Sequence, residues 1–555
     1  MNKKKSDTGF LVQGSILAMA SLISRIIGLI YRIPLIGIIG DVGMDYYATA
    51  FEIYNNLLII SSYSLPLAVS KLVSANLSRG RRKNVYRVLK GALLFATVTG
   101  GTAALILLFS AEAFTAAMKT PFSIFAVRAL IPTLLVVAVL GVLRGFFQGL
   151  GSMMPSAISQ VLEQIANAIV SVWAAYVLFE RGKNIGAVLG DTESYAAAYG
   201  AAGGTLGTNI GAISGLAFML FVFSIYMRVF KKKMKRERGV KVNAFSYTLK
   251  ILIVTIIPVL LSTTIYNISG IIDQALFKNI ATLQGHTTHE IDVWWGVFSG
   301  KYKVLINVPI SISSALAASS VPTLTAAFAA ENEKQVRNLI NAAMRFVMVI
   351  AIPSCVGLAV LAKPIFMLLF PGTIETLDMA SQIMLVGSVA VVFYSMSTLS
   401  NGLLQGINKL NVPVKNAAIA LVAHMILLVG LMLFFRLNIY AVVISNAFFA
   451  FIMCILNARD LQRYSGYRQE IQKTFLIPAI ASAVMGAVAY GVYQIAYTVS
   501  KSNAISLCIS IILAVVVYAV VLLLMKGLSE DDILRFPKGY LIVKLAKKMH
   551  LLKDR

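Results

Sequence analysis

Fourteen long apolar stretches constrain what this chain can fold into. Each is at least about as long as the roughly 20 residues that an α-helix needs to cross the bilayer core. They lie at residues 11–40, 47–74, 89–110, 123–147, 156–179, 200–227, 248–273, 296–327, 338–362, 378–406, 412–435, 438–458, 474–498 and 503–525. Apolar residues make up 58% of the 555 residues and charged residues 13%, a balance that the surface of a soluble protein could not accommodate. We therefore expect an all-α integral membrane protein with about 14 transmembrane helices.

The connections between these stretches are short, which narrows the classes of function. None contains the Gly-Lys-Ser/Thr loop of nucleotide-driven pumps. The longest outer loops, of roughly 20 to 25 residues, offer little room for the acid and base residues of a polymerase or glycosyltransferase, so we expect no enzymatic activity. Cys355, Cys454 and Cys508 lie inside apolar stretches, and no disulfide is predicted. The basic start at 1–5 lacks a cleavage site after it and is expected to lead into the first helix.

Lysine and arginine residues are divided unevenly between the two sides of the membrane. With the amino terminus in the cytoplasm, about 34 of the 49 basic residues fall on inner segments and about 9 on outer loops, as the positive-inside rule requires. Both termini are therefore expected to be cytoplasmic. The net charge of +26 reflects clusters such as 79–83 and 231–236, which we expect to face anionic lipid and not nucleic acid. The tail after Lys526 mixes basic and apolar residues, and either an amphipathic helix on the membrane surface or a solvated tail would fit it.

An internal repeat relates the two halves of the chain. Gly145-Phe-Phe-Gln-Gly149, followed by Pro155, recurs as Gly402-Leu-Leu-Gln-Gly406, followed by Pro413. A weaker match aligns 84–92 with 335–343. An offset of about 250 residues matches the first six stretches to the next six in the same orientation, which predicts two parallel six-helix repeats. The predicted parts are an N-lobe at 1–230, a C-lobe at 231–465, two further helices at 466–526 and a basic cytoplasmic tail at 527–555.

These motifs resemble one superfamily of transporters. The segment Ser24-Arg-Ile-Ile-Gly28 with Arg32, the two Gly-x-x-Gln-Gly turns, the run Leu305-Ile-Asn-Val-Pro309 and the plan of six, six and two helices are similar to the multidrug/oligosaccharidyl-lipid/polysaccharide (MOP) exporter superfamily. Within it, the chain resembles the polysaccharide biosynthesis proteins of the stage V sporulation protein B branch and the MurJ-type lipid II flippases. The resemblance implies two V-shaped lobes around a cavity that opens alternately to each side of a bacterial cell membrane. It also implies that the last two helices hold an undecaprenyl tail while the diphosphate-sugar head crosses.

Two arginines on the first helix are the leading candidates for binding a diphosphate. Arg25 and Arg32 are seven residues apart, so they differ by about 20° around the helix axis and share one face. A guanidinium group pairs well with phosphate and stays charged at any relevant pH. The alternative for Arg32 is a structural ion pair with Glu52, whereas no comparably placed acid is evident for Arg25.

Other charged residues in or near the helices are further candidates, because ionisable groups at membrane depth usually line cavities or form pairs. Arg144 and Glu163 face each other across a short turn and are predicted to form a structural pair. Arg128 has no evident partner, so it stays a candidate for the cavity. Lys301 and Lys303 open the eighth helix, where the resemblance implies cationic residues.

A coupling ion is a second possible ligand. Asp273, together with Asn267 and Asn416, could offer oxygen ligands to Na⁺ or a proton; the alternative is a plain acid at a helix end near Lys278. A polar outer loop carries a group of possible metal ligands, namely His286, His289, Glu290 and Asp292. A single His-x-x-His spacing in such a loop is weak evidence, and no metal site is predicted.

The sequence and the resemblance together predict a flippase that moves a polyprenyl-diphosphate-linked cell-wall precursor, lipid II, to the outer leaflet by alternating access. No cofactor is expected beyond Na⁺ or H⁺ as a coupling ion, and the implied partners are membrane lipids and cell-wall polymerases of peptidoglycan biosynthesis and cell shape. The alternatives are export of another lipid-linked oligosaccharide (teichoic, capsular or spore cortex) or a MATE-like drug or ion antiporter. Drug exporters usually have twelve helices and offer acids to cationic substrates, which disfavours the last alternative.

Overall fold

The computed structural model describes residues 2–237, 242–527, 530, 540 and 543–544. These residues are almost entirely helical and include no β-strand. By packing, the chain divides into two compact units, Met1–Gly300 (unit 1) and Lys301–Arg555 (unit 2). The predicted basic tail at 527–555 lies almost wholly outside the described residues.

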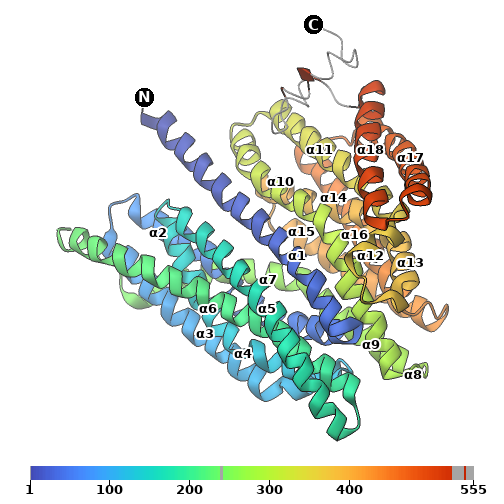
Figure 1. The fold of residues 1–555 in the computed structure, drawn as a ribbon. Helices are drawn as coiled ribbons and strands as arrows, with labels where there is room; N and C mark the ends of the chain where they lie inside the picture. The colour runs from blue at the N-terminus through green and yellow to red at the C-terminus, as the bar shows by residue number, and fades with distance from the viewer. Residues whose placement is uncertain (1, 238–241, 528–529, 531–539, 541–542, 545–555) are drawn as a thin grey trace. The chain divides into compact units, whose positions relative to one another are not determined.

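Unit 1 has nine α-helices among its described residues (Figure 1). They are α1 (Asn2–Leu58), α2 (Leu65–Leu77), α3 (Arg82–Ala117), α4 (Ile124–Gly149), α5 (Met154–Leu189), α6 (Thr192–Lys235), α7 (Phe245–Asn267), α8 (Ser269–Leu283) and α9 (Thr288–Gly296). A π-helical segment, η1 (Ile59–Tyr63), joins α1 to α2, and a 3₁₀ turn, η2 (Pro121–Ser123), precedes α4. Gly40 has φ 69° and kinks α1 into two helices, a backbone conformation that glycine adopts at little cost.

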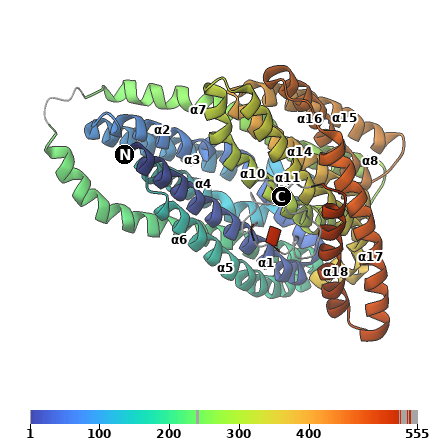
Figure 2. The ribbon, with the colours of Figure 1, turned by 90° about the horizontal axis from the view of Figure 1, so that it is seen from above.

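Helices α3 to α6 run side by side in unit 1, as Figures 1 and 2 show. Apolar residues of α2, α3, α4, α6 and α7 form the main buried core. Helices α5 and α6 pack closely against each other, because glycines recur every fourth residue on α6. At Gly203 and Gly207 even one added methyl group would overlap Ala174 or Ser171 of α5. Small residues of this kind let two membrane helices approach closely.

Unit 2 has nine further α-helices among its described residues. They are α10 (Lys303–Ala329), α11 (Glu333–Val360), α12 (Ala362–Leu369), α13 (Leu377–Gly387), α14 (Ala390–Gly406), α15 (Asn411–Leu433), α16 (Ile439–Ser465), α17 (Ile477–Ser500) and α18 (Asn503–Leu524). Short segments η3 (Val297–Tyr302), η4 (Ile374–Thr376) and η5 (Gln472–Leu476) precede α10, α13 and α17. The last two helices lie side by side and pack against α11 (Figure 2).

Each of the fourteen apolar stretches predicted to be helical is helical in the structure, apart from short breaks such as that at Ile268. Among the described residues, ten helical segments are long and apolar enough to cross a membrane, or eleven when α13 and α14, bent by 48°, count as one span. The first two predicted stretches fall in one continuous segment, Met19–Leu77, with the kink at Gly40 inside it. The chain is therefore a multi-pass, all-α membrane protein.

The two Gly-x-x-Gln-Gly motifs occupy corresponding places. Each ends a helix, α4 or α14, just before the next helix begins. A Cβ at Gly145 would lie 2.5 Å from the carbonyl oxygen of Pro66, and one at Gly402 would lie 2.9 Å from the Cβ of Ala317. Pro66 and Ala317 are themselves separated by nearly the repeat distance. The same close contact is thus made once in each copy of the repeat.

Candidate functional site

Arg25 and Arg32 both lie on α1, before its kink, but in different surroundings. Arg25 is exposed, whereas Arg32 is partly buried and interacts with the hydroxyl groups of Tyr31 and Tyr47. Those two hydroxyl groups are 3.0 Å apart and buried. Arg32 is therefore held by a pair of phenols, whereas Arg25 lies on the exposed surface of α1.

Contacts with α5 fix the orientation of this part of α1. The hydroxyl group of Ser21 donates to Gln160 Oε1 at 3.3 Å, and that of Ser24 donates to the Gln160 carbonyl oxygen at 3.4 Å. A Cβ at Gly28 would lie 3.8 Å from Gln164 Oε1, so α1 and α5 remain in contact one turn further on. These contacts fix the part of α1 that carries Arg25 against α5.

The acids and amides predicted to bind an ion are placed in both units. In unit 1, the Glu52 carboxylate lies so close to Gly270 of α8 that an added Cβ there would be 2.5 Å from Glu52 Oε2. Asp273 on α8 is buried, and Asn267 at the end of α7 is exposed. In unit 2, the Asn416 amide donates to Asn457 Oδ1 at 3.0 Å and to Asp460 Oδ2 at 2.8 Å. The grouping of Asn416 with Asp273 and Asn267 stays a prediction.

The two lysines predicted at the start of the eighth helix differ in burial. Lys301, in η3, is 1% exposed, and its Nζ donates to Thr376 Oγ1 at 2.6 Å. Lys303 opens α10 and is partly buried. A buried ammonium group held by a hydroxyl positions η4 within unit 2 and is less available to a ligand than a surface lysine.

Two arginines on α4 form ion pairs. Arg144 Nη2 lies 2.7 Å from Glu163 Oε2 on α5, and Arg144 Nε donates to Ser159 Oγ at 2.7 Å, so the residues predicted to pair are in contact. Arg128 Nη2 lies 3.0 Å from Glu112 Oε1 on α3, on an exposed surface. The expectation that Arg128 has no partner is wrong, because the sequence separation of sixteen residues concealed the contact between α3 and α4.

The predicted outer loop with two histidines is partly helical. Glu290 caps the start of α9: its carboxylate accepts hydrogen bonds from the backbone N–H and the hydroxyl group of Thr287. These bonds hold the pKa of Glu290 below its usual value. In the part of the chain that the structure describes, no three His, Cys, Asp or Glu residues are grouped as a metal site would require.

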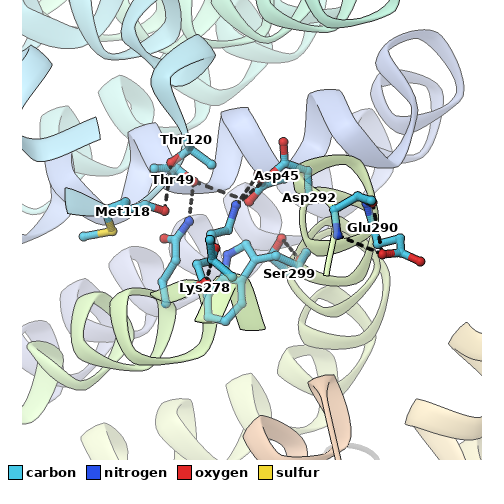
Figure 3. A network of polar contacts seen from close by, with 12 residues as sticks. Asp45, Thr49, Met118, Thr120, Lys278, Glu290, Asp292 and Ser299 are labelled. Atoms are coloured by element: carbon cyan, nitrogen blue, oxygen red, sulfur yellow. Dashed lines mark hydrogen bonds and ion pairs between the residues drawn. The ribbon is translucent and has the colours of Figure 1, made fainter. Parts of the chain in front are cut away.

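A buried charged cluster that sequence reasoning missed lies between α1, α8 and α9 of unit 1 (Figure 3). Lys278 Nζ is 2.6 Å from Asp45 Oδ2 and 3.0 Å from Asp292 Oδ1. Sequence reasoning placed Lys278 and Asp292 in an outer loop and Asp45 in an outer turn. The available signal was weak: Gln274 and Lys278 are four residues apart and therefore share one face of α8.

Two family models match the chain. The model described as polysaccharide biosynthesis protein matches residues 11–328, and the model described as MatE matches residues 304–429. Among similar proteins, the lipid II flippase MurJ of Bacillus subtilis is 27% identical over 501 residues, which is 86% of this chain and 87% of that protein. Stage V sporulation protein B of Bacillus subtilis is 23% identical over 538 residues, 96% of this chain and 99% of that protein.

Solved structures of transporters share the fold. The lipid II flippase MurJ in an inward closed conformation matches with a TM-score of 0.63 and 17% identity, over 91% of this chain and 97% of that one. An inward-facing MATE family transporter of the MOP superfamily matches with a TM-score of 0.57 and 14% identity, over 83% of this chain and 100% of that one. The helices described above are therefore arranged as in MOP transporters.

Proposed function

The chain belongs to the polysaccharide biosynthesis protein family, and from this we propose that it is a flippase for an undecaprenyl-diphosphate-linked cell-wall precursor. The substrate we propose is lipid II, carried from the inner to the outer leaflet of a bacterial plasma membrane by alternating access. The observation that carries the proposal is the similarity to the lipid II flippase MurJ along most of both chains. The role that follows is in peptidoglycan synthesis and cell shape, upstream of the cell-wall polymerases.

Binding of the head group is assigned to the first helix. Arg25 is exposed on a helix fixed against α5, and Arg32 lies one heptad further on the same face. Two guanidinium groups on one face suit the two phosphates of a diphosphate, since each can form two parallel hydrogen bonds to a phosphate group. Glu52, Arg128, Lys301 and Lys303 are secondary candidates for the cavity.

Holding of the lipid tail is assigned to the last two helices. In unit 2, Tyr518 on α18 donates to the Val349 carbonyl oxygen at 2.8 Å, and Asn503 donates to that of Pro364 at 3.0 Å, so α18 is attached to α11 and α12. Residues such as Ile512 and Val515 leave the outer face of α18 exposed and apolar. A fixed helix with an apolar outer face suits contact with a polyprenyl chain.

An alternative cargo is another lipid-linked oligosaccharide. Similarity to stage V sporulation protein B extends over 96% of this chain, so a glycan of the spore cortex, or a teichoic or capsular precursor, would fit the same fold. A MATE-like antiport of drugs or ions is less well supported. The matched MATE transporter leaves about a sixth of this chain without a counterpart, whereas MurJ leaves less than a tenth.

The energy source is part of the proposal. The sequence has no nucleotide-binding motif, so we infer that the membrane potential, or a gradient of Na⁺ or H⁺, drives the cycle. Asp273, Asn267 and Asn416 are the residues proposed for a coupling ion. Both termini are placed in the cytoplasm by the distribution of basic residues.

The test uses a bacterium in which the essential lipid II flippase can be depleted. After depletion, cells that express this chain are treated with an external toxin that cleaves lipid II, and the cleaved product is measured. We expect cleavage with the wild type. Because a charge-assisted hydrogen bond contributes roughly 1.5–3 kcal/mol, Arg25→Ala should reduce cleavage by about tenfold or more. Arg25→Lys keeps the charge but not the bidentate geometry and should be intermediate.

Arg337→Ala is the matched control, because Arg337 forms an exposed pair with Glu333 within α11. It should behave as the wild type at equal expression. A well-expressed wild type that leaves lipid II protected would overturn lipid II as the cargo and favour another lipid-linked glycan. Normal transport by Arg25→Ala would overturn the role assigned to the first helix.

A further inference from the structure

Three charged side chains are buried together where α8 and α9 meet α1 in unit 1. Asp45 and Lys278 are fully buried and Asp292 is 2% exposed. The Lys278 ammonium group contacts both carboxyl groups, at 2.6 and 3.0 Å (Figure 3).

The charges in this cluster do not balance unless one of the two carboxyl groups carries a proton. One ammonium group beside two ionised carboxylates leaves a net negative charge in a site closed to water, and an uncompensated buried charge is strongly unfavourable. The neighbouring groups are neutral: Thr49 donates to Asp45 Oδ1 at 3.5 Å and itself accepts from the Gln274 amide. Gln274 is fully buried, and its Oε1 has no hydrogen-bond partner among the described residues.

Among the ion pairs of the described residues, Lys278 is the cation that contacts Asp45 and Asp292. The hydroxyl group of Tyr46 reaches Asp292. Asp41 on α1 and Asp273 on α8 are further buried acids. Exposed charged groups on the surrounding helices form the pairs His286–Glu290, His289–Glu193, Arg128–Glu112 and Lys183–Glu180. Of the other charged groups on α1, Arg32 interacts with Tyr31 and Tyr47, and Glu52 lies beside Gly270.

We propose that Asp45, Asp292 and Lys278 form a binding site for a single proton, and that this proton holds the α8–α9 segment against α1. The proton is shared by the two carboxyl groups, with Lys278 as the fixed counter-ion. Release of the proton leaves the negative charge uncompensated, so the cluster separates and water enters. The site does not depend on which lipid-linked glycan the chain carries.

The packing around the cluster makes this attachment sensitive to small shifts. A Cβ at Gly296 of α9 would overlap the backbone of Asp41, so α9 lies directly against the kinked part of α1. Trp295 is fully buried beside this contact, with its ring stacked on Phe277 at 5.7 Å between centroids. We expect separation of α9 from α1 to expose Trp295, because it precedes Gly296 at that contact.

Trp295 also provides the measurement. The chain has three tryptophans, and Trp173 and Trp294 are replaced by phenylalanine so that only Trp295 reports. The ring of His286 lies 4.8 Å from that of Trp294, so protonation of His286 would change the fluorescence of Trp294. Replacing Trp294 removes this second source of pH dependence. Quenching of Trp295 fluorescence by acrylamide is then measured on the purified full chain in lipid nanodiscs, without substrate.

Between about pH 5 and pH 9 we expect quenching to rise with pH, because the open form has ordinary carboxylates that are ionised in this range and the closed form keeps one extra proton. For one proton, the opening equilibrium should change by up to about tenfold per pH unit. Asp292→Asn should show low quenching at every pH, since a carboxamide is neutral and still offers Lys278 an oxygen. Asp45→Asn should also show low quenching at every pH. It provides the test of the proton site if Asp292→Asn does not fold.

Asp378→Asn is the control, because Asp378 forms an exposed pair with Lys363 in unit 2. It should keep the pH response of the parent. A parent protein whose quenching does not change with pH, or asparagine variants that respond as the parent does, would overturn the proton site. Either result is independent of the transport assay, so failure of the flippase proposal would be seen separately.

Discussion

At the scale of single residues, burial determines how much an ion pair contributes to the stability of the folded protein. Arg144–Glu163 and Arg128–Glu112 both join α4 to a neighbouring helix at 2.7 and 3.0 Å. The side chains of the first pair are 14% and 20% exposed, and those of the second 53% and 78%. Exposed charges are solvated in either state, whereas a lost partner leaves a partly buried charge without compensation.

We expect Glu163→Gln to lower the free energy of unfolding by about 2–4 kcal/mol, because Arg144 then loses its counter-ion in a partly buried place. Glu112→Gln, the matched change, should cost less than about 1 kcal/mol. Denaturation of both variants in the same detergent gives the comparison. An equal decrease in the free energy of unfolding for the two variants would mean that the Arg144–Glu163 pair is as accessible to solvent as the Arg128–Glu112 pair.

At the scale of elements, the α5–α6 contact depends on the absence of side chains. Gly207 faces Ser171 with no space for a Cβ, whereas Gly101 on α3 has no atom within 4 Å of the place a Cβ would occupy. Both glycines are in the middle of long helices. The same substitution at the two positions therefore separates packing from helix propensity.

Gly207→Ala should destabilise the protein by about 1–3 kcal/mol through forced separation of α5 and α6. Gly101→Ala should be neutral or stabilising by about 0.5–1 kcal/mol, since alanine favours the helix and meets nothing. Thermal unfolding in detergent checks both changes. A Gly207→Ala variant as stable as the wild type would show that α5 and α6 can separate at little cost.

The membrane-spanning helices could be predicted from the sequence, because their hydrophobicity alone specifies them. All fourteen apolar stretches are helical because the membrane requires that backbone groups be satisfied within the segment. Helices α8 and α9 were not predicted beyond residue 273, since their polar residues resemble a loop in a hydropathy pattern. Lys278 of α8 is paired with Asp45 of α1, which is distant in sequence, and a local sequence pattern cannot reveal such a contact.

The candidate site shows the same limit. The contact between Arg144 and Glu163 was predictable because a short turn brings α4 and α5 together. Asp45 and Lys278 are 233 residues apart, and only the folded arrangement of α1 and α8 brings them into contact. Arg25 and Arg32 were placed on one helix face by their spacing, but the phenol groups around Arg32 became visible only in the structure.

At the scale of the whole molecule, the excess of basic residues on alternate connections defines a sidedness that each helix must obey. Highly exposed residues give positions to test it: Val188 and Leu283 in unit 1 belong to predicted outer connections, and Phe434 in unit 2 lies at the predicted outer end of the stretch 412–435. Ser78 and Ala330 are exposed on predicted inner connections of the two units. An error of one crossing anywhere between two of these positions would reverse the assignment of every later one.

We therefore expect single cysteines at 188, 283 and 434 to react with a membrane-impermeant maleimide in intact cells, and cysteines at 78 and 330 to react only after lysis. The background replaces Cys355, Cys454 and Cys508 by alanine, which removes the exposed thiol on α18. Labelling at 330 without lysis, with 78 still protected, would mean an odd number of crossings between them and would overturn the parallel repeat. Labelling at 78 and protection at 188 would instead invert the whole molecule, and the arginines of α1 would then meet their ligand from the opposite side.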